Sequence, residues 1–313
     1  AVGLAALYSN TTGRWSTAQG NLALYANTTG NQNSAFGLYS LRYNTSGVNN
    51  AAFGIWTLYS NTTGSNNTAS GYYALKSNTT ANYNTAMGRC ALSSNTQDSN
   101  TAVGTNAGRA NTTGSVVAVG RDALLSNTTG VKNTAVGYEA SQCNTTGVRN
   151  TTLGYFAGRC NTSSDVTAIG ACALANSTGY ANTASGSYAL AQNTTGTNNT
   201  ASGALSLYSN INGTYNTASG YHSMYTNSTG QQNNAFGFRA LCGNTSGSFN
   251  SGFGTNALCA NSTGGHNNAF GLVALRANTT GFYNAAFGNY TLCSNTCGCY
   301  NTAIGYEVLR DNT

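Results

Sequence analysis

Small apolar residues return at fixed distances along the whole chain. Aligned on a recurring glycine, one repeat reads N-T-A-x-G-x-x-A-L-x-x-N-T-T-G-x-x, and we number these positions one to seventeen. Position three is nearly always alanine and position nine is usually leucine, while Asn, Thr, Ser and Gly fill most other positions. Fourteen of the eighteen intervals between successive position-five glycines are 17 residues, and four are 16. A constant short period of this kind is typical of a solenoid.

The composition of the repeat predicts β-structure. Apolar residues at positions three, eight and nine give a helix too little apolar surface, and the glycines oppose helix formation. The segment N-T-A-x-G-x is typical of a short strand, and N-T-T-G of a corner, because Asn and Gly tolerate left-handed backbone conformations. We therefore expect an all-β fold, a parallel β-solenoid (β-roll or β-helix) with 17-residue turns of two short strands and two corners. Residues 1–313 would form one continuous solenoid of about 18 turns, an excerpt of a longer repeat array.

Like residues cluster at position four of neighbouring repeats. Four successive repeats carry phenylalanine there, at Phe236, Phe253, Phe270 and Phe287. In-register stacking would separate their backbones by about 4.8 Å, so we predict that these rings form a core ladder. Positions three and four point to opposite faces of a strand. Because both are apolar in many repeats, we also expect partner chains to cover the second face.

Sparse charge narrows the possible functions. Charged residues make up 6% of the chain, and the net charge of +6 is scattered, so no basic stripe indicates nucleic-acid binding. No apolar run approaches the roughly 20 residues of a membrane span. The six carboxylates and two histidines form no stacked pair suited to acid–base catalysis. We expect a protein that is not an enzyme and holds no cofactor or metal, since Cys297-Gly298-Cys299 is only a weak metal signal.

Segments such as N-T-A-V-G at residues 133–137 and N-T-A-I-G at residues 301–305 resemble known surface repeats. They are similar to the head repeats of trimeric autotransporter adhesins and to Asn-Thr-Gly-rich repeats of phage tail fibres and other surface fibres. The resemblance implies a left-handed β-roll, often trimeric, used in adhesion or as a spacer, although those heads repeat at about 14 residues. We expect the structural shaft of an extracellular fibre, filament or adhesin at a cell or virion surface. Its partners would be copies of itself, in a filament or trimer, and surface glycans.

A binding module is the alternative function. Threonine columns at positions two, thirteen and fourteen could order water on a regular lattice, as an ice-binding solenoid does. A carbohydrate-binding surface could instead use exposed tyrosines at position ten as stacking platforms. The candidate platforms are Tyr8, Tyr25, Tyr59, Tyr208 and Tyr225.

Cysteines and Asn-linked glycosylation motifs complete the candidate sites. Nine cysteines suggest an oxidising compartment. Candidate disulfide residues are Cys143 and Cys160, Cys242 and Cys259, and Cys293 and Cys297; the alternative is reduced thiols. The N-T-T/S corner also matches the glycan acceptor motif, unless its Asn serves turn geometry alone. Candidate glycosylation sites are Asn10, Asn27, Asn44, Asn61, Asn78, Asn111, Asn127, Asn144, Asn161, Asn176, Asn193, Asn227, Asn244, Asn261 and Asn278.

Overall fold

The regular elements of the protein are short parallel strands, one in each repeat. The computed structural model describes residues 1–312, and within that range it contains eighteen strands of three residues. They are β1 (Thr17–Gln19), β2 (Ser34–Phe36), β3 (Ala51–Phe53), β4 (Thr68–Ser70), β5 (Thr85–Met87), β6 (Thr101–Val103), β7 (Val117–Val119), β8 (Thr134–Val136), β9 (Thr151–Leu153), β10 (Thr167–Ile169), β11 (Thr183–Ser185), β12 (Thr200–Ser202), β13 (Thr217–Ser219), β14 (Asn234–Phe236), β15 (Ser251–Phe253), β16 (Asn268–Phe270), β17 (Ala285–Phe287) and β18 (Thr302–Ile304).

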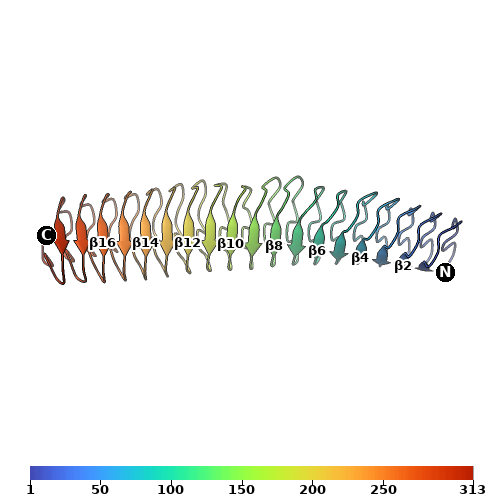
Figure 1. Cartoon of the computed structure of the whole chain (residues 1–313), viewed down its shortest axis with the longest axis horizontal. Helices are drawn as coiled ribbons and strands as arrows, with labels where there is room; N and C mark the ends of the chain where they lie inside the picture. Colours follow the sequence, from blue (N-terminus) through green and yellow to red (C-terminus); the bar gives the residue numbers. More distant parts are fainter. Residues whose placement is uncertain (313) are drawn as a thin grey trace. The chain divides into compact units, whose positions relative to one another are not determined.

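The chain divides into two compact units, Ala1–Thr152 and Leu153–Thr313. Within the first unit, strands β1 to β8 pair in sequence order, parallel and in register; Ala102 of β6, for example, lies opposite Ala118 of β7. Strands β10 to β18 pair in the same way within the second unit (Figure 1). The predicted all-β parallel solenoid with 17-residue turns is thus confirmed. That the two units form one continuous array stays a prediction.

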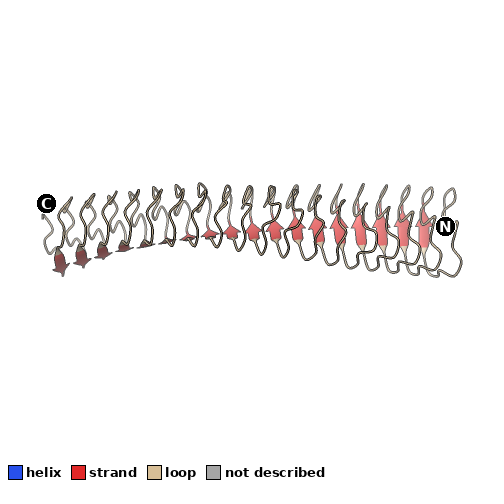
Figure 2. Cartoon of the chain, turned by 90° about the horizontal axis from the view of Figure 1, so that it is seen from above, coloured by secondary structure: helices blue, strands red, loops and turns tan. Residues whose placement is uncertain are grey.

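Each turn contains one strand, so the predicted second strand is wrong. The strands of each unit are joined by long non-strand segments (Figure 2). Residues at positions seven and nine take left-handed backbone angles, as with Leu22 at φ 54° and Leu24 at φ 50°. The Ala23 N–H donates to the Gly20 carbonyl at 3.3 Å and the Asn27 N–H to the Leu24 carbonyl at 3.2 Å, which closes two tight turns. Alternating left-handed residues cannot continue an extended strand.

The position-five glycine is required by backbone conformation and by close packing of neighbouring turns. These glycines have φ between 123° and 141°, a region that side chains rarely enter. A Cβ added to Gly237 would lie 2.6 Å from the carbonyl oxygen of Gly254 in the next turn. The regular return of glycine along the sequence therefore marks the point where each strand ends and the chain turns sharply.

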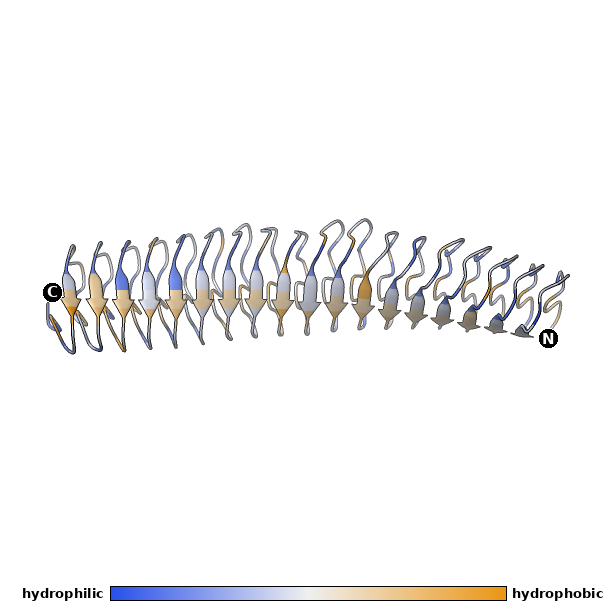
Figure 3. Ribbon diagram, in the orientation of Figure 1, coloured by the Kyte–Doolittle hydropathy of each residue, from blue (hydrophilic) through white to orange (hydrophobic). Residues whose placement is uncertain are grey.

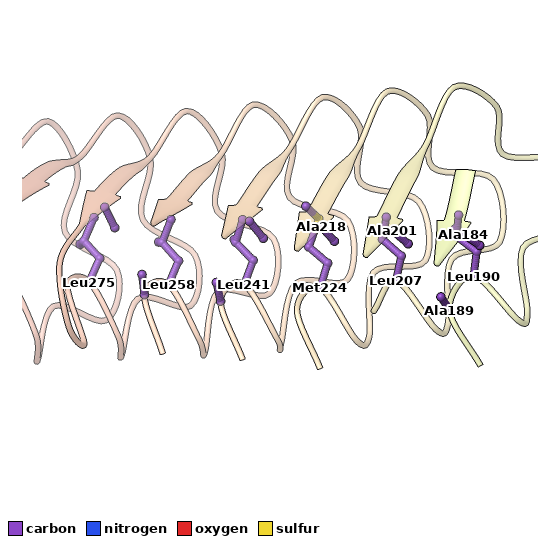
Figure 4. Close-up of a cluster of buried hydrophobic side chains, with 14 of the residues drawn as sticks. Ala184, Ala189, Leu190, Ala201, Leu207, Ala218, Met224, Leu241, Leu258 and Leu275 are labelled. Carbon is purple, nitrogen blue, oxygen red and sulfur yellow. The ribbon is translucent and has the colours of Figure 1, made fainter. Parts of the chain in front are cut away.

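The core of each unit is a narrow column of alanine and leucine. In the inner turns, the alanines at positions three and eight and the leucines at position nine are buried. In the second unit, Leu190, Leu207, Met224, Leu241 and Leu258 line up one per turn, with alanines beside them (Figure 4). Because equivalent residues stack, each position of the repeat forms a continuous column along its unit.

Candidate functional site

The Asn-Thr-Thr-Gly corner encloses a column of buried asparagines at position twelve, which we call the corner ladder. The Nδ2 of Asn227 donates to Oδ1 of Asn210 at 2.9 Å and to the Gly230 carbonyl at 3.1 Å. Its Oδ1 accepts a hydrogen bond from Nδ2 of Asn244 at 2.7 Å. Asn233 belongs to a second column, at position one. Its Nδ2 donates to the carbonyl of Gly247, a corner glycine, at 2.8 Å. Buried amides that are hydrogen-bonded in this way favour one register of the stacked turns, because a shift would leave their polar atoms without partners.

Thirteen of the fifteen predicted glycosylation sites lie in this ladder and are at most 1% exposed. An Asn-linked sugar is attached at Nδ2, the atom that in residues such as Asn227 and Asn244 donates along the ladder and into the corner. Attaching a sugar to one of these buried residues would require the corner to open, so their burial argues against glycosylation of the folded chain, and their glycosylation stays a prediction. They are Asn27, Asn44, Asn61, Asn78, Asn111, Asn127, Asn144, Asn161, Asn193, Asn227, Asn244, Asn261 and Asn278.

Asn10 and Asn176 differ from the other candidates because both are exposed. Asn176 belongs to one of the 16-residue turns, in which Ser177 occupies the ladder position. The Ser177 hydroxyl is buried and accepts a hydrogen bond from Nδ2 of Asn193 at 3.0 Å. Asn176 consequently lies one position before the ladder, at position eleven, and faces solvent. These two residues remain candidate acceptors.

The predicted phenylalanine ladder forms, but it lies outside the core. Successive rings of Phe236, Phe253, Phe270 and Phe287 stack with centroids 4.7 to 5.0 Å apart. Phe236 is 38% exposed and Phe287 is 40% exposed. The interior is filled by the small alanines of position three, so the side chains of positions two and four point outward and form what we call the sheet face. Strands β14 and β16 begin with hydrophilic Asn and end with apolar Phe (Figure 3).

Positions seven, ten and eleven form the opposite surface, which we call the turn face. In the first unit, the Arg42 guanidinium lies 4.8 Å from the ring centroid of Tyr39 and 5.1 Å from that of Tyr43. Lys76 similarly lies 4.4 Å from the ring centroid of Tyr73. Such cation–π contacts order these long side chains over aromatic rings.

The predicted tyrosine platforms largely stack on one another. Tyr8 and Tyr25 have centroids 5.4 Å apart and planes 8° apart, and Tyr208 and Tyr225 have values of 5.3 Å and 7°. Tyr59 makes tilted and edge-on contacts with its aromatic neighbours. A ring that stacks on both sides would offer a ligand only its edge. The Tyr208 face opposite Tyr225, however, points toward the preceding turn, where position ten is the small Ala191.

A groove of about 290 Å³ opens at this place on the turn face of the second unit. The Gln192 amide donates to the Tyr208 hydroxyl at 3.2 Å, and the Arg159 guanidinium lies 4.6 Å from the Phe156 ring centroid. A hydrogen bond with Cys172 raises the pKa of Tyr188. The full lining is Phe156, Arg159, Cys172, Ala175, Asn176, Tyr188, Ala191, Gln192 and Tyr208.

The candidate cysteines of the second unit are thiols. A hydrogen bond from Cys259 lowers the pKa of Cys242 to about 6, with further help from Arg239. The same bond raises the pKa of Cys259 above its usual range. No disulfide joins these two, nor Cys293 and Cys297, among the described residues. Stacked residues of one column point in the same direction, which disfavours the disulfide geometry, and Cys293 and Cys297 lie at different positions of the turn.

The predicted Cys143–Cys160 pair joins residues of the two different units and stays a prediction. Cys297 and Cys299 are both exposed. Within residues 1–312, no group of three or more His, Cys, Asp or Glu side chains is placed to hold a metal ion. No helix in the same range is long and apolar enough to cross a membrane.

The threonine columns divide between two surfaces. Corner hydroxyls at position thirteen bond to the next turn, as when Thr28 Oγ1 donates to the Thr45 carbonyl at 3.0 Å. Position-two threonines instead lie in the strands and point outward, beside serine in β11 to β13. The alternating hydroxyls that an ice-binding surface needs therefore occur on three successive strands of the second unit, next to the phenylalanine ladder. Ice binding stays a prediction.

Comparison with protein-family models found no family that matches the chain, and comparison with curated proteins also found no match.

Proposed function

We propose that this chain is the non-catalytic shaft of an extracellular fibre, filament or adhesin. The observation that carries the proposal is that neighbouring turns are hydrogen-bonded on every side. In the second unit, the Thr200 N–H bonds to Asn216 at 2.8 Å in the sheet, and the Leu207 N–H bonds to Ser223 at 3.0 Å in the turn. The Ser228 N–H bonds to Thr245 at 2.9 Å in the corner. Bonds distributed around each turn, together with the corner ladder, would resist separation of the turns under load.

Self-association is the second element of the proposal. The sheet face of β14 to β17 is uncharged, and its stacked phenylalanines are partly exposed. A second copy of the chain would present the same spacing of about 4.8 Å between rungs, so that its rings could pack against this ladder along several turns. Burying such a ladder would draw copies together laterally. The resemblance to adhesin heads and phage fibre repeats points to the same kind of assembly.

Electron microscopy of the purified 313-residue chain tests assembly. We expect elongated particles that associate side by side. Phe253→Asp should reduce this lateral association, because it places a charge within the ladder. Ser209→Asp adds the same charge to the turn face and should leave association unchanged. Particles that stay single in the unmodified protein, or that associate equally in both variants, would contradict self-association through the ladder.

Labelling with an antibody against the chain tests its location. Intact source cells or virions should bind the antibody at their surface without permeabilisation. Labelling that appears only after permeabilisation would place the protein inside and refute the extracellular shaft.

A further inference from the structure

Two cysteines follow one another in the position-ten column of the second unit, on the turn face. They are Cys242 and Cys259, which belong to successive 17-residue turns. The Leu241 N–H donates to the Ala257 carbonyl at 2.9 Å. The Gly243 N–H donates to the Cys259 carbonyl at 2.7 Å. These two bonds lie on either side of Cys242 and hold its backbone beside that of Cys259.

Side chains at position ten stand one above another at about the spacing of the turns. Tyr208 and Tyr225, which precede Cys242 in the column, have ring centroids 5.3 Å apart and planes 7° apart. The thiols of Cys242 and Cys259 also meet, because a hydrogen bond joins them, with Cys259 as the donor. Cys242 is buried and Cys259 is half-buried, so the pair can be reached from the surface on the Cys259 side.

The spacing of this pair suits a bridging metal ion better than a disulfide. A disulfide needs its two sulfur atoms about 2.05 Å apart, whereas neighbouring turns lie about 4.8 Å apart and carry their side chains in the same direction. A metal–thiolate bond is about 2.3 Å long, so two sulfur atoms on opposite sides of one ion lie about 4.6 Å apart. This separation is close to that of the turns, and both cysteines can reach it by small changes of their side-chain angles.

We propose that Cys242 and Cys259 bind one soft monovalent metal ion, Cu(I), between their sulfur atoms. Thiolate sulfur is a ligand that selects Cu(I), and this ion accepts two such ligands in a line. Each thiol gives up its proton when its sulfur binds the ion. One Cu(I) therefore displaces two protons, and the site with two thiolates carries a single negative charge.

The surroundings of the pair match this charge and disfavour other ions. Arg239, in the same turn as Cys242, is hydrogen-bonded to it, and Arg276 follows Cys259 in the column. Positive charge beside the two sulfur atoms stabilises the negative site. The two turns that hold the cysteines contain no Asp or Glu, so hard ions that need carboxylate oxygens are disfavoured. Structural zinc takes four ligands, and residues 1–312 place no three His, Cys, Asp or Glu side chains together.

Anaerobic titration of the full chain with Cu(I), in competition with a chromogenic chelator, tests the proposal. The other cysteines could also bind copper, so the titration uses a background in which Cys143, Cys297 and Cys299 are each replaced by serine. Cys242 and Cys259 are then the one pair of cysteines that share a position in neighbouring turns. We expect one tight Cu(I) site in this background, and X-ray absorption should show two sulfur neighbours around the ion.

Substitution of either cysteine should remove the tight site. Loss of a supporting group around a metal ion weakens binding by about 10- to 100-fold, so loss of one of two ligands in Cys242→Ser or Cys259→Ser should weaken it by at least about a hundredfold. Serine fits at position ten, since Ser93 occupies it in the first unit. Arg239→Gln removes a supporting charge and should weaken binding by about tenfold.

His222, in the turn before Cys242, provides the matched control. Its ring stacks on Tyr221 and Tyr225 with centroids 4.1 Å and 4.6 Å away. His222→Phe keeps a ring in this stack and should leave the affinity for Cu(I) unchanged, because two sulfur atoms complete the site. Circular dichroism checks that each variant keeps its β-structure.

Four results would overturn the proposal. They are a tight site that survives Cys259→Ser, a loss in His222→Phe as large as that in Cys259→Ser, three or more sulfur neighbours, and Zn²⁺ bound as tightly as Cu(I). The sulfur neighbours are counted with both cysteines in place, so this measurement decides the matter even where a serine variant does not fold. The outcome is independent of fibre assembly, which is measured separately by microscopy, so each proposal can fail without the other.

Discussion

Replacing the buried Asn227 with alanine should be among the most destabilising substitutions in the Asn-Thr-Thr-Gly corners. The substitution removes three hydrogen bonds: from Nδ2 to Asn210 at 2.9 Å, from Nδ2 to Gly230 at 3.1 Å, and from Asn244 to Oδ1 at 2.7 Å. A hydrogen bond contributes about 1 kcal/mol net, and a buried group left without its partner costs a further 1–3 kcal/mol or so. The Gly230 carbonyl keeps its second donor, Asn216 at 2.8 Å. Asn244 keeps its bond to its own corner carbonyl at 2.9 Å.

The group left without a donor in this variant is thus the buried Oδ1 of Asn210. We expect a loss of about 4 kcal/mol in the free energy of unfolding, three bonds plus one uncompensated acceptor. Urea denaturation followed by circular dichroism measures the total. Hydrogen exchange should be faster in the turns next to Asn227 than elsewhere, because a solenoid turn is stabilised mainly by its neighbours.

Two controls separate the ladder from the asparagine side chain as such. Asn176→Ala removes an exposed asparagine of the neighbouring position and should change stability by less than about 0.5 kcal/mol. Asn227→Ser should cost less than alanine, because Ser177 already occupies a ladder position and bonds to Asn193. If Asn227→Ala proved as stable as Asn176→Ala, the corner ladder would not be a source of stability and our reasoning would be refuted.

Three further changes test other parts of the fold. Gly237→Ala should cost several kcal/mol in thermal melts, because it combines φ of 134° with a Cβ 2.6 Å from the next turn's backbone, and a loss below about 1 kcal/mol would contradict this. Leu258→Ala should lower the free energy of unfolding by about 2–5 kcal/mol, whereas Phe253→Asp on the sheet face should lower it by less. If urea denaturation gave the reverse order, the phenylalanines would have to be part of the core. The alkylation rate of Cys242 should rise through a midpoint near pH 6 and shift to higher pH in Cys259→Ala; an unchanged midpoint would exclude the thiol–thiolate bond.

The period of the sequence was sufficient to predict the solenoid, because in-register stacking follows directly from identical turns. The period was not sufficient to predict which side of each strand faces the interior of the solenoid. Alanine at position three and phenylalanine at position four are both apolar, and only the width of the interior decides that alanine lies inside. The second predicted strand failed for a related reason: an A-L-x-x segment does not reveal the left-handed angles of Leu22 and Leu24.

The asparagines were the hardest residues to interpret. An Asn-Thr-Thr-Gly corner reads as an exposed turn, because a single turn has no partner for its amide. In the stacked array most of these amides find one partner in the turn before and another in the turn after, as Asn227 does, and burial becomes favourable. The sequence did carry one usable signal, the missing residue of the turn that contains Asn176, which shifts this asparagine out of the ladder and onto the surface.

Some positions of the repeat are fixed by stability and others are free to vary, so differences between turns arise mainly at the second kind of position. Positions three, five, nine and twelve are fixed by the core, the sharp turn and the corner ladder, so most changes there carry a cost in stability. The residue at position ten contributes little to these interactions, and the column accordingly holds arginine, lysine, tyrosine, cysteine, serine, alanine, leucine and glutamine in different turns. In the second unit two successive turns carry alanine there, Ala175 and Ala191, and both line the groove on the turn face. A repetitive shaft can therefore vary the shape and chemistry of its turn face at position ten, while the strands and ladders that hold it together stay unchanged.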